Sequence, residues 1–249
     1  MSLLVYRGGA PLDHIGIGVP DTESGVNAVA RRLGYKPILQ DPVPGQFYWS
    51  GTLPLGAGRF LEILGPNPIY KGFNPFIEIV KKLEQPTPLF WYIATHDFTA
   101  FTAAAKEAGA RIQQVESAAH TTDGVPVDYT RAMIGPGFLS VCPNVIQWRS
   151  RYEGLHDDAG PSFLGLTLTH PEASRLNRLF KSLGIEQHVK EGPHQIAIKL
   201  GTPKGEVEFS GAGLELRGPS AMIRMANLYV RWLMRGRTSA RLHNWLERL

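Results

Sequence analysis

Two ionisable residues in the N-terminal part of the chain lie in segments that are otherwise apolar. His14 belongs to the run LDHIGIGV, and Glu62 belongs to the run RFLEIL. A carboxylate inside an apolar strand is costly unless it is ion-paired, hydrogen-bonded or bound to a metal. An imidazole nitrogen and a carboxylate oxygen suit Zn, Ni, Mn or Fe, so the two residues predict half of a divalent metal site. A lone strand histidine is more often structural, so the interpretation depends on Glu62 lying close by.

Aromatic side chains gather in the segments that would line a cavity beside these residues. Side chains alternate along a strand, so with His14 facing the cavity, Phe90 and Tyr92 face it too, whereas Trp91 packs under helices. The pattern predicts a small-molecule ligand with an aromatic or apolar body, and a purely structural aromatic core is the alternative. The predicted substrate-binding residues are Trp49, Phe90, Tyr92, Asp128 and Arg131.

The elements that would hold these residues follow one order three times. An apolar strand leads into a polar helix, the helix ends at a glycine, and further strands follow. The three helices end at Gly34, Gly109 and Gly184, because glycine adopts the left-handed conformation at a helix end without steric cost. Asp21 and Asp97 are typical N-caps for the first two helices. Repetition of this kind predicts units that bury their apolar faces against one another.

Strands joined through a helix and then through a meander predict an α+β fold. Repeated βαβββ modules would form a curled mixed sheet that encloses a cup, followed by a partial third module and a C-terminal helical tail. Ferredoxin-like units with a filled core are the alternative. The predicted segments are a first module at 11–66, a connector at 67–88, a second module at 89–150, the partial third module at 162–211 and a basic helical tail at 219–249.

Composition and charge narrow the class of protein. The 249 residues are 43% hydrophobic and 19% charged, as in ordinary globular proteins. The single cysteine excludes an internal disulfide and favours a reducing, cytoplasmic location. The net charge of +4 is concentrated in the segment from Arg217 onward, which has seven arginines and one acid. We expect this tail to pack against the domain or to form a homodimer. A membrane-surface helix is a weaker alternative, and a nucleic-acid arm is weaker still.

Several short motifs occur in an order that points to one superfamily. They are LDHIGIGVPD at 12–21, PLGAGRFLE at 54–62, DG at 123–124, PNVIQW at 143–148 and TPKGEV at 202–207. Together with the βαβββ order, they resemble the vicinal oxygen chelate superfamily, and within it the glyoxalase-like domain group. The resemblance covers about residues 11–211. It implies that paired modules form a cup in which the first and last strands of each module hold a metal, and that two substrate oxygens chelate this metal.

Transferred to this chain, the resemblance implies a reduced metal site. The first module supplies His14 and Glu62, and the second supplies Gln147, where a carboxylate is usual. The counterpart of His14 in the second module falls at Phe90 or Leu89, and neither side chain binds a metal.

The sequence therefore predicts a protein that binds a small organic ligand in a cup. A divalent metal would act as a Lewis acid on a carbonyl or vicinal-oxygen substrate, with Glu62 as the catalytic residue. Metal-dependent lyase, isomerase and dioxygenase reactions all fit, because a shared fold does not fix the reaction. The alternative is a metal-free protein that sequesters an aromatic or apolar compound, which the missing second-module ligand favours.

Overall fold

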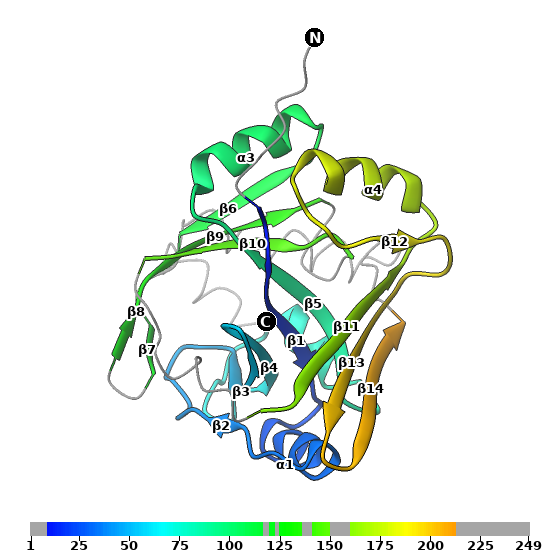
Figure 1. Cartoon of the computed structure of the whole chain (residues 1–249). Coiled ribbons are helices and arrows are strands. Elements are labelled where there is room, and N and C mark those ends of the chain that lie inside the picture. Colours follow the sequence, from blue (N-terminus) through cyan, green and yellow to red (C-terminus); the bar gives the residue numbers. More distant parts are fainter. Residues whose placement is uncertain (1–8, 117–119, 123–124, 136–140, 150–159, 213–249) are drawn as a thin grey trace.

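A large mixed sheet of eight strands organises the molecule (Figure 1). The computed structural model describes residues 9–116, 120–122, 125–135, 141–149 and 160–212. The strand order is β2-β3-β4-β1-β5-β10-β9-β6. The strands are β1 (Leu12–Gly18), β2 (Ile38–Leu39), β3 (Tyr48–Gly56), β4 (Arg59–Pro66), β5 (Thr87–Ala94), β6 (Ile112–Glu116), β9 (Tyr129–Ile134) and β10 (Asn144–Trp148).

Two βαβββ modules lie side by side in this sheet. Strand β1 is followed by helix α1 (Thr22–Leu33) and by β2 to β4, while β5 is followed by helix α3 (Phe98–Glu107) and by β6, β9 and β10. In each module the first strand pairs in parallel with the last, and β1 pairs with β5 in antiparallel fashion at the module boundary. The α+β class and the βαβββ organisation predicted from the sequence are confirmed.

Matching caps start the two module helices. Asp21 caps α1 by accepting a hydrogen bond from the Ser24 N–H at 2.9 Å, and Asp97 caps α3 by accepting one from the Ala100 N–H at 2.8 Å. Gly34 ends α1 with a φ of 77°, a conformation that glycine adopts without strain. The two caps therefore mark equivalent positions in the two modules.

One face of the large sheet is covered by helices and by a small four-stranded sheet. Helix α4 (Ala173–Ser182) belongs to this layer, and its Phe180 ring lies 6.0 Å, centroid to centroid, from the fully buried Trp91 of β5. The main hydrophobic cluster runs through both sheets. The strands of the small sheet are β11 (Ser162–Thr169), β12 (Val189–Lys190), β13 (Gln195–Thr202) and β14 (Gly205–Ala212).

The third unit has its own topology. Its strand order is β12-β11-β13-β14, so the last strand lies at the edge and does not pair with the first. Glu208 on β14 is consequently exposed. A separate hairpin of β7 (His120–Thr122) and β8 (Val125–Val127) precedes β9. The predicted tail at 219–249 lies outside the described residues.

The other face of the large sheet, called the cup face below, carries a second hydrophobic cluster. The short helix α2 (Pro75–Val80) packs Phe76 and Ile77 into this cluster together with Phe90 of β5. The large sheet curls around this face, so that β3 and β4 lie across from β9 and β10 (Figure 1). The cup predicted from the sequence is therefore a curled sheet with an aromatic inner surface.

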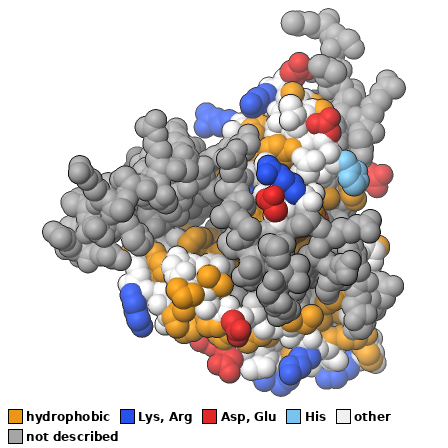
Figure 2. Space-filling model, turned by 90° about the vertical axis from the view of Figure 1, so that its left-hand side faces the viewer, with side chains coloured by type: hydrophobic (Ala, Val, Ile, Leu, Met, Phe, Trp, Pro, Cys, Tyr) orange, Lys and Arg blue, Asp and Glu red, His pale blue; other side chains and the backbone are white. Residues whose placement is uncertain are grey.

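The outer surface mixes side-chain types. Figure 2 shows the molecule from the left-hand side of Figure 1, and basic and acidic side chains lie among hydrophobic ones there without gathering by sign. Across the described part of the chain, no helix is both long enough and apolar enough to span a bilayer.

Candidate functional site

Strand register brings His14 and Glu62 to the same face of the sheet. His14 on β1 lies opposite Phe60 of β4 and Tyr92 of β5, while Gly16 lies opposite Glu62 and Phe90. Residues two apart on a strand share a face, so all of these positions belong to the cup face. His14 and Glu62 are thus diagonal neighbours on adjacent strands, within reach of a common ligand.

The imidazole of His14 is held in a defined orientation. Its ring stacks between Phe60 and Tyr92, with centroid distances of 4.5 and 4.2 Å. Its Nδ1 lies 2.5 Å from Oδ1 of Asp13. Asp13 is buried and also accepts a hydrogen bond from Trp148 Nε1 at 2.8 Å. Because an ionised carboxylate only accepts, Nδ1 carries the proton of the neutral imidazole and Nε2 keeps its lone pair.

A two-fold relation between the modules identifies the second-module counterparts. His14 and Phe90 each stand seven residues before the capping aspartate of their module, and the register of β1 and β5 is symmetric about Ile15 and Trp91. Gly16 is therefore equivalent to Tyr92. Since Gly16 pairs with Glu62 and Tyr92 pairs with Asn144, the counterpart of Glu62 is Asn144.

Gln147 lies elsewhere. Along β10 it alternates with Asn144, Ile146 and Trp148, so its side chain leaves from the opposite face. There its Nε2 donates to the backbone oxygen of His96 at 2.7 Å, next to the start of α3. The structure therefore does not bring Gln147 together with His14 and Glu62, and the ligand set expected from the sequence changes accordingly.

Two predicted substrate-binding residues also face away from the cup. Trp49 alternates with Tyr48 on β3 and donates from Nε1 to the backbone oxygen of Gln40. Asp128 is half exposed and lies 3.7 Å from Arg149 in a surface ion pair. The cup-face residue of that part of β3 is Tyr48, one position before the predicted Trp49.

Arg131 contributes a guanidinium group to the cup face. It lies on β9, two positions from Tyr129, and its Nη1 donates a long hydrogen bond of 3.4 Å to the Tyr92 hydroxyl. Its guanidinium carbon stands 5.8 Å from the centroid of the Tyr129 ring. Burial lowers the pKa of Arg131, but the neighbouring phenols Tyr92, Tyr129 and Tyr48 outweigh burial and raise it. The side chain is therefore a permanent cation.

The pKa of Tyr48 on β3 responds to Arg131 on β9, which shows that curling of the sheet brings these two strands close together. In a flat sheet, β3 and β9 would stand roughly 24 Å apart, at about 4.8 Å per strand. Burial raises the pKa of Tyr48, and the nearby charges of Glu62 on β4 and Arg131 on β9 also act on it. Burial likewise raises the pKa of Tyr92 to about 12, although Arg131 opposes this shift. Both phenols are neutral donors at physiological pH.

Three buried polar atoms of the cup face have no hydrogen-bond partner among the residues that the structure describes. They belong to three different strands, and the register places Thr52 directly opposite Glu62. Buried polar groups are nearly always hydrogen-bonded, so such atoms indicate a missing partner. The atoms are Thr52 Oγ1, Asn144 Nδ2 and Arg131 Nε.

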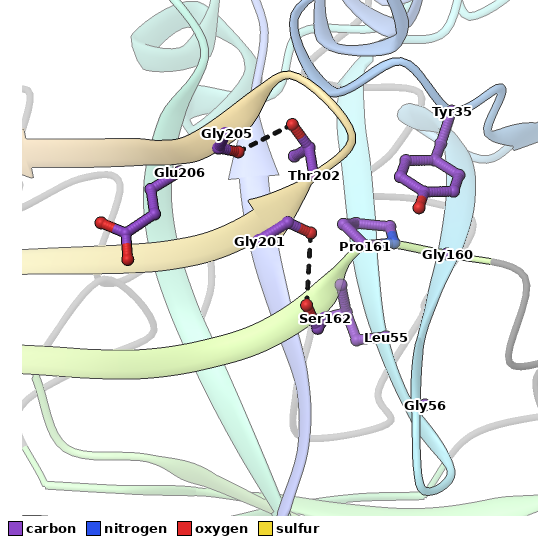
Figure 3. Close-up of a pocket in the computed structure, with 10 residues that line it drawn as sticks. All are labelled: Tyr35, Leu55, Gly56, Gly160, Pro161, Ser162, Gly201, Thr202, Gly205 and Glu206. Carbon is purple, nitrogen blue, oxygen red and sulfur yellow. Dashed lines mark hydrogen bonds between the residues drawn. The ribbon is translucent and has the colours of Figure 1, made fainter.

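A second concavity, of about 560 Å³, lies between the β3–β4 turn and the β13–β14 turn (Figure 3). Its lining combines glycines with the side chains of Tyr35, Leu55, Pro161, Ser162, Thr202 and Glu206. The hydroxyls of Ser162 and Thr202 donate to the backbone oxygens of Gly201 and Gly205, and Glu206 pairs with Lys199. Since these polar groups already have partners, this concavity offers less chemistry than the cup face.

Paired βαβββ modules that curl around one polar face define a cup-forming, glyoxalase-like class of protein. Residues 12–184 match the family described as the glyoxalase-like domain. The chain belongs to this family. The match spans both modules, including every cup-face residue described above.

Several solved structures are similar to this chain at low sequence identity. A hypothetical protein from Staphylococcus aureus is 14% identical, with a TM-score of 0.50, and the alignment covers 80% of this chain and 84% of that one. A 4-hydroxymandelate synthase mutant from Streptomyces coelicolor is 13% identical, with a TM-score of 0.47 and coverages of 89% and 68%. A methylmalonyl-CoA epimerase variant from Streptomyces coelicolor is 15% identical, with a TM-score of 0.42 and coverages of 59% and 99%. No curated protein matches the sequence significantly.

Sequence reasoning missed several residues of this site, among them Asp13, Tyr48, Thr52 and Asn144. The turn at Gly56–Gly58 could have revealed Tyr48, because hairpin register around that turn sets Thr52 opposite Glu62 and thereby puts Tyr48 on the same face. No comparable sequence signal marks Asn144. Its equivalence to Glu62 depends on the pairing of β5 with β10, two strands that are far apart in the chain.

Proposed function

We propose that this protein binds a small organic ligand at the cup face and transfers a proton at a carbon next to a carbonyl group. The observation that carries this proposal is the set of buried, unpartnered polar atoms of Thr52, Asn144 and Arg131. A ligand oxygen that meets these atoms would remove the cost of leaving them unbonded. The aromatic residues around them, such as Phe90 and Tyr92, suit an apolar ligand body.

The acid–base groups around this surface have complementary roles. Among the described residues, Glu62 has no ion pair or hydrogen bond, so its carboxylate is free to accept a proton from carbon. The electron pair left behind forms an enolate, whose oxygen would accept a hydrogen bond from Asn144 Nδ2. Return of the proton to the same or a neighbouring carbon completes an epimerisation or isomerisation. His14 Nε2 is a second acceptor beside Glu62.

The residues do not fit a tightly held metal. His14 and Glu62 are the ionisable donors of the first module, but their counterparts are Phe90 and Asn144. In the described part of the chain, no group of three or more His, Cys, Asp or Glu side chains could hold a metal ion. Catalytic zinc sites use three protein ligands, so we derive no step through a metal.

Solvent exchange tests the proposed reaction directly. We expect the protein to accelerate deuterium incorporation from D₂O into at least one member of a panel of small ketones, 2-oxo acids and acyl thioesters, followed by proton NMR. Glu62→Gln should slow the exchange by about 10²- to 10⁴-fold, the usual range for a lost general base. The exposed Glu206→Gln is the matched control. Equal exchange rates in Glu62→Gln and the unsubstituted protein would refute the proposal.

Metal content provides a separate prediction. Protein purified without chelator should contain well below one equivalent of Zn, Ni, Mn or Fe, because His14 and Glu62 supply only two donors. Dialysis against a chelator should leave both the melting temperature and the exchange rate unchanged. A stoichiometric metal that is lost in His14→Ala would contradict this expectation and would restore the Lewis-acid mechanism.

Binding without turnover is the second candidate function. The observation in its favour is that Phe90 and Asn144 occupy the positions equivalent to His14 and Glu62, so the second module lacks the imidazole and the carboxylate of the first. Sequestration would show as saturable ligand binding that Glu62→Gln leaves intact, with no deuterium incorporation for any bound compound.

A further inference from the structure

We infer that the cup ligand is a monocarboxylate and that Arg131 binds its carboxylate group. This inference builds on the proposed ligand site but adds the charge and class of the ligand. Arg131 projects from β9, whereas Glu62 projects from β4 on the far side of β1, β5 and β10. The anchoring group and the base would thus approach the ligand from opposite sides of the cup.

Arg131 has no counter-ion in the part of the protein that the structure describes. Among the described residues, its only hydrogen bond is the 3.4 Å contact with the neutral Tyr92 hydroxyl, and no carboxylate lies within ion-pairing distance. Its Nε is buried and unbonded. Burying a guanidinium without an acceptor is costly, so a ligand anion would supply what the protein does not.

The donor groups around Arg131 suit a carboxylate. A guanidinium presents N–H groups in a planar fork that matches the two oxygens of a carboxylate. The Tyr92 hydroxyl lies against Nη1 and adds a neutral donor to the same region. A carboxylate seated here would meet Arg131 Nε, the bonding position that is now empty.

The charges of the cup face favour a ligand with one negative charge. The described cup-face groups with a free formal charge are the cation Arg131 and the anion Glu62, since Asp13 is bound to His14 and Trp148. A phosphate dianion would be only half neutralised by one guanidinium, and Glu62 would repel it about twice as strongly as a monocarboxylate. A single carboxylate balances Arg131, and the aromatic surface around Phe90 accommodates the rest of the ligand.

The test compares isosteric aromatic probes by isothermal calorimetry and by NMR titration. Phenylacetate should bind at least about tenfold more tightly than the neutral phenylacetamide, as expected for a charge-assisted hydrogen-bond pair. Arg131→Gln should abolish this preference. Arg149→Gln, which removes an equal charge from a surface ion pair, should retain it. The comparison of the two probes on the unsubstituted protein does not depend on the folding of any variant.

Three other results of these titrations would overturn the carboxylate inference. Equal affinities for phenylacetate and phenylacetamide, or tighter binding of phenyl phosphate, would overturn the carboxylate inference while leaving the ligand site intact. Failure of benzoate and phenylacetate to bind up to about 10 mM, a concentration above the ~1 mM dissociation constant of a weak ligand, would also overturn it. Loss of deuterium exchange in Glu62→Gln is measured separately, so the proposed proton transfer is tested independently of the carboxylate inference.

Discussion

At the scale of single residues, the site depends on how His14 is held. Phe60 and Tyr92 fix the plane of the imidazole, and Asp13 fixes which nitrogen carries the proton. Trp148 in turn anchors Asp13. A carboxylate that orients a histidine in this way is a recurrent feature of catalytic and ligand-binding sites.

Asp13→Asn should switch the tautomer of His14. The amide oxygen of asparagine can keep the hydrogen bond from Trp148, while its NH₂ group donates to Nδ1, so the imidazole proton moves to Nε2. Long-range nitrogen–proton NMR of the neutral imidazole distinguishes the two tautomers. We also expect deuterium exchange to fall, because Nε2 no longer accepts a proton.

The control for this substitution is Asp128→Asn, which removes a half-exposed carboxylate paired with Arg149. It should leave the His14 signals unchanged. If Asp13→Asn retains the proton on Nδ1, then Asp13 does not set the tautomer and its role is limited to packing.

At the scale of elements, the sequence predicts local features well and non-local register poorly. The caps at Asp21 and Asp97 and the helix end at Gly34 follow from side-chain hydrogen bonding and backbone freedom within a few residues. By contrast, the sequence predicts Gln147 as the ligand, and Gln147 does lie in the correct strand. Its side chain, however, leaves from the face opposite the cup. Only the pairing of β5 with β10 selects Asn144.

The third unit illustrates the same limit. Its strand, helix and further strands follow the order of the first two modules along the chain. Strand β11 nevertheless pairs with β12 and β13, which gives a different sheet order. Element order is therefore readable from sequence periodicity, whereas strand pairing is decided by which apolar faces meet across the fold.

Gly16→Ala should report on the contact between the two central strands. A Cβ at Gly16 would lie 2.1 Å from the Phe90 ring, and that ring is buried within the aromatic cluster of the cup face. The overlap should lower the free energy of unfolding by about 1–3 kcal/mol, measured by urea denaturation. Gly165→Ala is the control, because no atom lies within 4 Å of the added methyl group.

A double-mutant cycle makes this prediction specific. Phe90→Ala alone should cost about 3–5 kcal/mol, as expected for removing a buried aromatic ring. In the double variant the new methyl group occupies part of the space that Phe90 vacates, so the two losses should be less than additive by about 1 kcal/mol or more. Strict additivity would show that Gly16 and Phe90 do not share this space.

At the scale of the whole molecule, curling of the sheet places polar groups from both modules in one apolar surface. Tyr48 on β3 and Arg131 on β9 belong to nearly opposite ends of the large sheet, yet each affects the pKa of the other. The helices and the small sheet on the other face supply the continuous hydrophobic core. The molecule thus separates a face that stabilises the fold from a face that binds a ligand.

This separation predicts a loss of stability in alkali that originates at the cup face. The phenol of Tyr92 is almost fully buried, and burial raises its pKa from 10.0 to about 12. Below pH 10 it is neutral in both the folded and the unfolded chain, so its contribution to stability is constant. Between pH 10 and 12 the unfolded chain releases this proton while the folded chain keeps it. The free energy of unfolding should therefore fall by about 1.4 kcal/mol per pH unit from this group.

Urea denaturation at intervals from pH 8 to pH 11.5 measures this effect. Tyr92→Phe cannot ionise, so its stability should fall less steeply than that of the unsubstituted protein above pH 10, whatever its stability at neutral pH. Tyr48→Phe should act in the same direction, because burial raises the pKa of that phenol too. The decisive quantity is the slope of the free energy of unfolding against pH. This slope measures how many protons the folded protein binds that the unfolded chain has released. If the free energy of unfolding falls equally steeply with pH in Tyr92→Phe and in the unsubstituted protein, then the Tyr92 hydroxyl is open to water. The cup would then not be the enclosed ligand-binding surface that the unpartnered atoms of Asn144 and Arg131 indicate.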